Sequence, residues 1–195
     1  KIKKSWIIIG VIVILVIVGY SSFKGTYNNM VALNENVDGK WAQVENVYQR
    51  RSDLIPNLVN TVKGYAAHEK ETLEGVVEAR AKATSVNVSA DNLTPEKFAA
   101  FQQAQDGLSS ALSRLMVVVE RYPDLKANQS FLELQAQLEG TENRIAVERK
   151  KFNEATQNYN TYIKVFPKNL YANMFGFEKK PYFAAQEGAD KAPEV

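Results

Sequence analysis

The feature that most constrains this chain is a stretch without a single charged residue, from Trp6 to Phe23. Its centre, residues 7–18, consists only of Ile, Val, Leu and one Gly. Eighteen residues of helix cover about 27 Å, close to the hydrocarbon thickness of roughly 30 Å. Trp6 and Tyr20 lie near the two ends, where amphipathic rings favour the membrane interface. We therefore expect residues 6–23 to form a transmembrane helix embedded in a lipid bilayer.

A cleaved signal peptide is the alternative interpretation of the same run. Gly19-Tyr20-Ser21 has the small-x-small pattern that a cleavage site requires.

The charges that flank the run predict its orientation. Lys1, Lys3 and Lys4 precede it, whereas Lys24 is the only basic residue among the 15 positions that follow. Because basic residues are retained on the cytoplasmic side, we expect a single-pass protein of the cell membrane with residues 1–5 in the cytoplasm. The body of the chain is then periplasmic or extracellular.

Composition excludes several classes of function. Three of the 24 Lys and Arg precede the apolar run, so 21 basic residues face 22 acidic ones beyond it, a net charge of −1. Proteins that bind nucleic acids concentrate basic residues on one face, so we exclude a nucleic-acid partner. The chain has no Cys, which excludes disulfides, thiolate metal sites and thiol catalysis.

Apolar residues at helical spacing predict that residues 26–183 form an all-α, antiparallel bundle of about four long helices. The first buried stripe consists of Val37, Trp41, Val44 and Tyr48. A second helix is expected from about Ser52, with Pro56 in its first turn, and its apolar face runs on to Val77. A single kinked helix through Pro56 is the alternative. Whether the first helix continues directly from the transmembrane segment is left open.

A polar loop and a third helix follow. Residues 84–94 are short, polar and poor in helix formers. Thr94-Pro95-Glu96 combines a hydroxyl cap, a preset φ and a carboxylate at the positive helix end, so it predicts a helix start. Tyr122-Pro123-Asp124 is expected to end this helix.

The fourth helix carries an unbroken heptad repeat, which is typical of coiled-coil packing. The repeat predicts a continuous helix of about 36 residues, roughly 54 Å long, that Pro167 ends. Glu148 lies in the companion seam and needs a partner, such as Arg144 or an arginine across the bundle. The repeating residues are Phe131, Leu138, Ile145, Phe152, Tyr159 and Phe166.

An aromatic segment follows the fourth helix and is a candidate assembly contact between subunits of a homo-oligomer. It either folds back over the bundle or meets a neighbouring subunit. The last residues, 184–195, are small and charged, and we expect them to be flexible. The candidate contact residues are Tyr171, Phe175, Phe177, Tyr182 and Phe183.

No residue set indicates catalysis, a cofactor or a metal. His68-Glu69 resembles part of a zinc motif, but His68 is the only histidine, and a zinc helix requires a second one a turn later. A di-iron bundle would need paired Glu-x-x-His motifs, which a chain with one histidine does not have. A serine hydrolase would have to use the same His68, and the chain has no Gly-x-Ser-x-Gly elbow. We expect His68 to be an exposed structural residue and the chain not to be an enzyme.

Polar side chains in two parts of the bundle form a candidate interaction cluster. They either bind an anion or a peptide end, or they form helix caps and salt bridges between helices, which is the commoner role. The candidate residues are Arg50, Arg51, Asp53, Asn57, Asn60, Glu142, Arg144 and Glu148.

Several motifs occur in an order that closely resembles the LemA family of bacterial membrane proteins. The longest is residues 50–59, Arg-Arg-Ser-Asp-Leu-Ile-Pro-Asn-Leu-Val, and others lie at residues 62–65, 120–123 and 125–128. Further matches are residues 27–28, 68–69, 141–145, 152–153, 159–160 and 175–177. The resemblance covers nearly all of the chain beyond the transmembrane segment.

This resemblance implies one N-terminal transmembrane helix, a bundle of long antiparallel helices and no established enzymatic activity. Relatives are connected with magnetosome membrane formation, envelope stress or a membrane metalloprotease. The expected function is therefore a structural or scaffolding component of the bacterial cell envelope that self-associates at the membrane. The alternative is an envelope-stress sensor or adaptor that binds a peptide, a solute or a membrane protease partner. The family has no settled ligand-binding residues to assign here.

Overall fold

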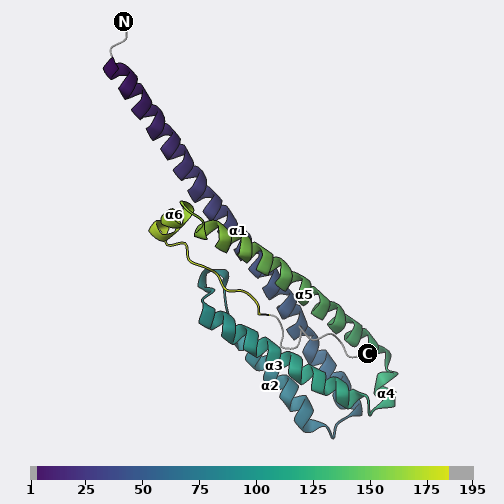
Figure 1. Cartoon of the computed structure of the whole chain (residues 1–195). Helices are drawn as coiled ribbons and strands as arrows, with labels where there is room; N and C mark the ends of the chain where they lie inside the picture. The colour runs from purple at the N-terminus through teal and green to yellow at the C-terminus, as the bar shows by residue number, and fades with distance from the viewer. Residues whose placement is uncertain (1–3, 185–195) are drawn as a thin grey trace, which may run out of the picture. The chain divides into compact units, whose positions relative to one another are not determined.

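The computed structural model describes residues 4–184 and is all-α over that range, as predicted (Figure 1). The predicted flexible tail lies outside the described residues except for Ala184. The chain forms two units: residues up to Val37 with Ala155–Lys179, and Asp38–Glu154 with residues from Lys180 onward. The elements are α1 (Lys4–Tyr65), α2 (Lys70–Ser85), a 3₁₀ turn η1 (Ala90–Asn92), α3 (Pro95–Val119), α4 (Pro123–Lys126), α5 (Gln129–Lys164) and α6 (Lys168–Phe175).

Helix α1 is continuous over 62 residues and contains both the apolar run and Pro56. The prediction of a new helix near Ser52 is therefore wrong, and the alternative of one helix through Pro56 is correct. Pro56 has no N–H to bond the carbonyl of Ser52 four residues earlier. Nε of Arg80 in α2 donates to that carbonyl instead, over 2.7 Å. A tertiary contact thus satisfies the group that the proline leaves without a helical partner.

The helix break lies at residues 66–69 rather than at Pro56, so the predicted continuous face from Ser52 to Val77 is also wrong. Leu73 and Val76 are buried as expected, but Val77 is 51% exposed. Glu69 in the turn accepts from the Tyr122 hydroxyl at 3.0 Å and pairs with Arg121 at 3.0 Å. These contacts come from a distant part of the chain, which explains why local sequence did not indicate the turn.

The third and fourth helices match the predictions closely. The side chain of Thr94 accepts from the backbone N–H of Lys97 over 3.3 Å and caps α3. Helix α5 is 36 residues long, as the heptad repeat predicted. Five of the six repeating residues are buried, but Phe166 lies beyond the end of α5 and is 79% exposed. The buried five are Phe131, Leu138, Ile145, Phe152 and Tyr159.

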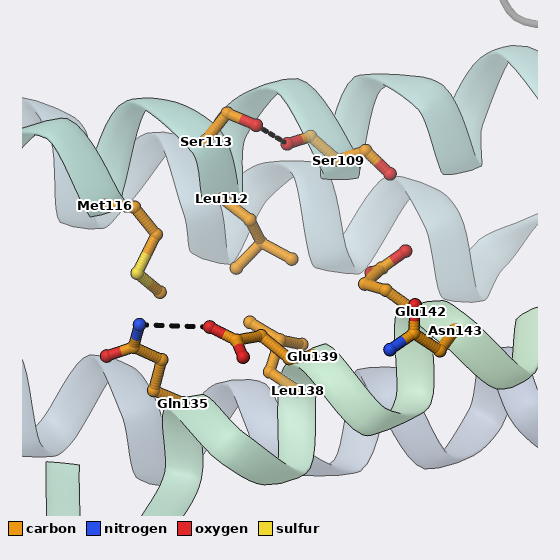
Figure 2. A pocket seen from close by; sticks show the side chains of 9 residues that line it. All are labelled: Ser109, Leu112, Ser113, Met116, Gln135, Leu138, Glu139, Glu142 and Asn143. Carbon is orange, nitrogen blue, oxygen red and sulfur yellow. Dashed lines mark hydrogen bonds between the residues drawn. The ribbon is translucent and has the colours of Figure 1, made fainter. Parts of the chain in front are cut away.

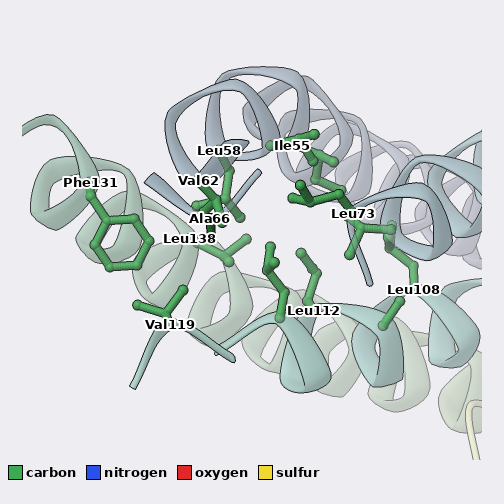
Figure 3. Close-up of a cluster of buried hydrophobic side chains, with 14 of the residues drawn as sticks. Ile55, Leu58, Val62, Ala66, Leu73, Leu108, Leu112, Val119, Phe131 and Leu138 are labelled. Carbon is green, nitrogen blue, oxygen red and sulfur yellow. The ribbon is translucent and has the colours of Figure 1, made fainter. Parts of the chain in front are cut away.

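The aliphatic core of the second unit joins residues of five helices, α1 to α5. Figure 3 shows part of this core. Ile55, Leu58 and Val62 of α1 meet the buried leucines of the other helices, and α2 lies against α3. Burial of such side chains contributes about 1.5–3 kcal/mol each. The partner residues include Leu73, Leu108, Leu112, Phe131 and Leu138.

An aromatic cluster extends this core, and Trp41 lies at its centre. The Trp41 ring packs within 5.2–5.7 Å of the rings of Phe98, Phe101 and Phe152, and Nε1 donates to the carbonyl of Val88 over 2.8 Å. Phe183 completes the cluster, stacked on Trp41 at 6.1 Å. The end of the aromatic segment therefore folds back over the bundle, one of the two predicted alternatives.

Candidate functional site

Arg51 lies at the centre of the only part of the predicted polar cluster that the structure brings together. Its side chain is 1% exposed. Nη1 donates to Oγ of Ser109 at 2.8 Å and to Oε1 of Glu142 at 3.0 Å. Nη2 donates to the carbonyl and to Oε1 of Gln105, at 3.2 and 2.5 Å. One guanidinium thus connects α1 with α3 and α5.

The surroundings of Arg51 explain how a charge can be buried here. Its guanidinium lies 5.0 Å from the ring centre of Tyr48, which adds a cation–π contact. Burial raises the pKa of Tyr48, so this hydroxyl stays neutral. Gln105 also donates to the carbonyl of Ala83 at 3.4 Å, which extends the network to α2. A buried, hydrogen-bonded arginine of this kind sets the register of helices against one another.

The other members of the predicted cluster do not join this network. On α1, Arg50, Asp53, Asn57 and Asn60 are exposed. On α5, Arg144 is exposed and does not pair with Glu148.

The partner expected for Glu148 was also wrong. Glu148 pairs with Lys151 at 2.8 Å, one turn away on the same helix. The i,i+3 spacing brings these side chains together locally, so no arginine across the bundle is needed.

Gln105 and Ser109 are the network members that sequence reasoning missed. Gln105 lies four residues after Phe101 and three before Leu108, within the buried stripe of α3. A polar residue at a core position of an amphipathic helix was the available signal, because a buried amide requires partners.

A groove between α3 and α5 opens beside this network (Figure 2). Its volume is about 540 Å³. The carboxylates of Glu139 and Glu142 line it together with the apolar side chains of Leu112, Met116 and Leu138. Glu142 therefore has two roles, as a partner of buried Arg51 and as a 41% exposed anion of the groove. Such a lining suits a cationic, partly apolar group.

A second hollow of about 240 Å³ lies between α1, the end of α2 and α3. Glu45 lines it, and burial raises the pKa of this carboxyl above its ordinary value of 4.5. Within the described residues no group of three or more His, Cys, Asp and Glu could hold a metal ion. His68 is exposed, in the turn between α1 and α2.

The candidate assembly residues occupy different environments. Phe183 is 5% exposed within the Trp41 cluster, whereas Tyr182 beside it is 46% exposed. In the other unit, Tyr171 packs against Phe23 at 5.4 Å, and Phe177 packs against Tyr27 at 5.9 Å.

Phe175, the remaining candidate, packs against Phe23 at 5.5 Å and Tyr27 at 4.9 Å, yet stays 41% exposed. Phe175 is therefore only partly covered by the other residues of its unit.

The N-terminal apolar run lies within the one described helix that is long and apolar enough to cross a membrane. None of the residues in its most apolar window is buried in the structure. Its length and composition are those of a helix that can cross a membrane.

Comparisons with known proteins identify relatives of the chain. The LemA family profile matches residues 40–195. The chain is 28% identical over 181 residues to magnetosome protein MamQ 2 of Paramagnetospirillum magneticum and over 182 residues to MamQ of Magnetospirillum gryphiswaldense. These alignments cover 84% of this chain but only 66% of each relative, slightly less than two thirds. Protein LemA of Metamycoplasma hominis is 22% identical over 168 residues, with 86% of this chain and 73% of that protein covered.

Proposed function

The chain belongs to the LemA family, and from this membership we propose that it is a membrane-anchored, non-enzymatic scaffold of the bacterial cell envelope that self-associates at the bilayer. The observation that carries the proposal is helix α1. One uninterrupted helix contains the membrane-spanning run and supplies core residues such as Trp41 and Leu58. The similarity to proteins named as magnetosome proteins supports a structural role.

The buried polar chemistry also supports a structural role. Four hydrogen bonds from the two terminal nitrogens of Arg51 are made to residues of its own chain. A guanidinium held in this way positions helices and is not available to a substrate. What remains exposed for a partner is the outer surface, including Phe175 and Tyr182.

The mass of the full chain in a mild detergent tests self-association. We expect an oligomer that Tyr182→Asp dissociates, because a buried charge opposes an apolar contact. Phe183→Tyr is the matched control, since Phe183 faces the chain's own core. A monomeric wild type would refute self-association. An oligomer unchanged by Tyr182→Asp and by Phe175→Asp would exclude the aromatic segment as the contact.

We also propose that the bundle lies outside the cytoplasm, on the basis of Lys1, Lys3 and Lys4 before the span. The chain has no Cys, so Val117→Cys, at a position 71% exposed, provides a single label site. A membrane-impermeant maleimide should label this cysteine in intact cells. Labelling only after lysis would show that the bundle lies in the cytoplasm.

An adaptor that binds a cationic peptide segment of a membrane protein is the second candidate. The groove with Glu139 and Glu142 favours it, because two carboxylates and an apolar floor fit such a segment. Glu139→Lys should then abolish co-purification of a membrane partner, whereas Glu133→Lys on the same helix should not. Retention of the partner by both variants would exclude the groove.

A further inference from the structure

Three apolar side chains are exposed in and just before α6. Phe166, Leu170 and Met174 follow one another at intervals of four residues and are 79%, 57% and 61% exposed. An ordinary surface helix turns such residues inward. Exposed apolar groups that lie together mark a contact with a partner or a membrane.

Helix α6 lies directly at the end of the membrane-spanning run. The ring of Tyr171 lies 5.4 Å from that of Phe23, the last residue of the run, and the ring of Phe175 lies 5.5 Å from it. Phe175 also reaches Tyr27, one turn further along α1, at 4.9 Å. All these contacts fall within a single unit of the structure. A bilayer that surrounds the run up to Phe23 therefore begins at the level of α6.

Contacts with the rest of the unit hold one face of α6 in place, so the opposite face has a defined orientation. Ala172 is 2% exposed. Gly176 ends the helix with φ at 74°, and the backbone N–H groups of Gly176 and Phe177 both donate to the carbonyl of Ala172. The hydroxyl of Tyr159 in α5 donates to the carbonyl of Glu178 at 2.9 Å. These contacts hold α6 and the segment after it against α1 and α5.

The charges around α6 are mainly positive, and the one acid just after it, the exposed Glu178, is followed by Lys179. Residues 155–177 and 5–34 contain no Asp or Glu, but they include Lys24, Lys164 and Lys168. Nζ of Lys168 lies 3.8 Å from the ring centre of Tyr162. A cationic, apolar surface beside a membrane span suits an anionic lipid headgroup layer.

We propose that α6 docks on the bilayer that its own span crosses. Phe166, Leu170 and Met174 enter the boundary between headgroups and acyl chains. Lys24, Lys164 and Lys168 bind the phosphates of anionic lipids. This inference rests on residues 6–23 spanning a membrane and is independent of self-association. Lipid is the occupant because the surface is continuous with the span and complementary in charge to anionic headgroups.

Single-cysteine labels on the full chain test the docking. The Cys-free chain is reconstituted in vesicles of phosphatidylcholine and phosphatidylglycerol, with an environment-sensitive fluorophore on Met174→Cys. Lipids with a shallow spin label should quench it several-fold more than the same fluorophore on Glu35→Cys. Glu35 is exposed and lies 12 residues, about 18 Å, beyond Phe23 on α1.

Two further measurements distinguish failure of the membrane span from failure of the docking and from contact with a second copy. A label on Ile12→Cys must be quenched by deep spin labels; if it is not, the span itself fails and the proposed anchoring with it. If Ile12→Cys is quenched but Met174→Cys is no more quenched than Glu35→Cys, the docking alone is refuted. Disulfide formation between Met174→Cys chains that persists at high dilution in lipid would identify a second copy as the occupant and overturn lipid docking.

The proposed binding of anionic lipids by the lysines is tested with the double variant Lys164→Glu, Lys168→Glu. Quenching of the Met174→Cys label should fall in vesicles that contain phosphatidylglycerol and stay unchanged in pure phosphatidylcholine. If the double variant and the chain with both lysines are quenched equally in both kinds of vesicle, the binding of anionic headgroups is refuted.

Discussion

Nη1 of Arg51 donates a hydrogen bond to Oε1 of Glu142 over 3.0 Å, between residues 91 positions apart in the chain. The pair is asymmetric, because Arg51 is 1% exposed and Glu142 is 41% exposed. Removal of the arginine side chain leaves the buried groups of Gln105 and Ser109 without their donor and opens a cavity. Removal of the glutamate side chain leaves a site that water can reach. The two truncations should therefore differ in cost.

Arg51→Ala should lower the free energy of unfolding by about 3 kcal/mol and Glu142→Ala by about 1 kcal/mol. Denaturant unfolding of the full chain in detergent, followed by circular dichroism, measures both. Arg50→Ala, at the exposed neighbouring position, is the control and should change little. Equal losses for Arg51→Ala and Glu142→Ala would contradict this account of the network.

The contact between Arg80 and the carbonyl of Ser52 predicts a coupling with Pro56. Arg80→Ala should cost about 1–2 kcal/mol in the wild type, because the carbonyl loses its only described donor. In a Pro56→Ala background the new N–H restores the helical bond, so the same change should cost less than half as much. A double-mutant cycle measures this difference. Additive effects would show that the proline and the arginine act independently.

Phe183→Ala should destabilise the bundle by about 3 kcal/mol, because it removes a buried ring from the Trp41 cluster. The segment from Gly176 onward should then become sensitive to protease. Tyr182→Ala is the matched control, since the neighbouring ring is 46% exposed. A protease pattern unchanged by Phe183→Ala would mean that other contacts hold the returning segment.

Thr94→Ala should cost about 1 kcal/mol, because the hydroxyl caps α3 through the N–H of Lys97. Thr84→Ala is a suitable control. Its hydroxyl bonds to carbonyls one turn earlier and caps no helix start. Thermal unfolding midpoints should rank wild type and Thr84→Ala together, above Thr94→Ala.

Glu45 should make stability depend on pH. Burial raises its pKa above 4.5 in the folded protein, so the folded state binds this proton more tightly than the unfolded chain does. The stability from this group is fully present below pH 4.5 and is lost as the pH rises through the folded pKa. Glu45→Gln should therefore raise the thermal midpoint at neutral pH and lose its advantage near pH 4. Glu35→Gln, an exposed acid on the same helix, should show neither effect.

The elements that sequence predicted well are those set by local chemistry or by long periodicity. The run from Trp6 to Phe23, the cap at Thr94 and the heptads of α5 all depend on residues close in sequence. The family resemblance is confirmed by the profile match over residues 40–195. These signals fix which helices exist and which faces they bury.

The sequence-based predictions were wrong where contacts with residues distant in sequence determine the local structure. Pro56 fits within α1 because Arg80 bonds the freed carbonyl, and the turn before α2 is held by Tyr122 and Arg121. Within the polar cluster, only Arg51 faces the interior and meets Glu142. Because a helix start was predicted near Ser52, the sequence pattern did not show whether Arg50 or Arg51 points inward.

The return of Phe183 to Trp41 has a consequence for how the protein is made. Ribosomes deliver Trp41 well before Phe183, and Asp38 pairs with Lys180, 142 positions later. The aromatic core is therefore incomplete until Phe183 has been synthesised, and its apolar rings stay open to water or to chaperones until then. A chain stopped just before Phe183 would carry every helix of the described residues but would lack the ring that closes the aromatic cluster.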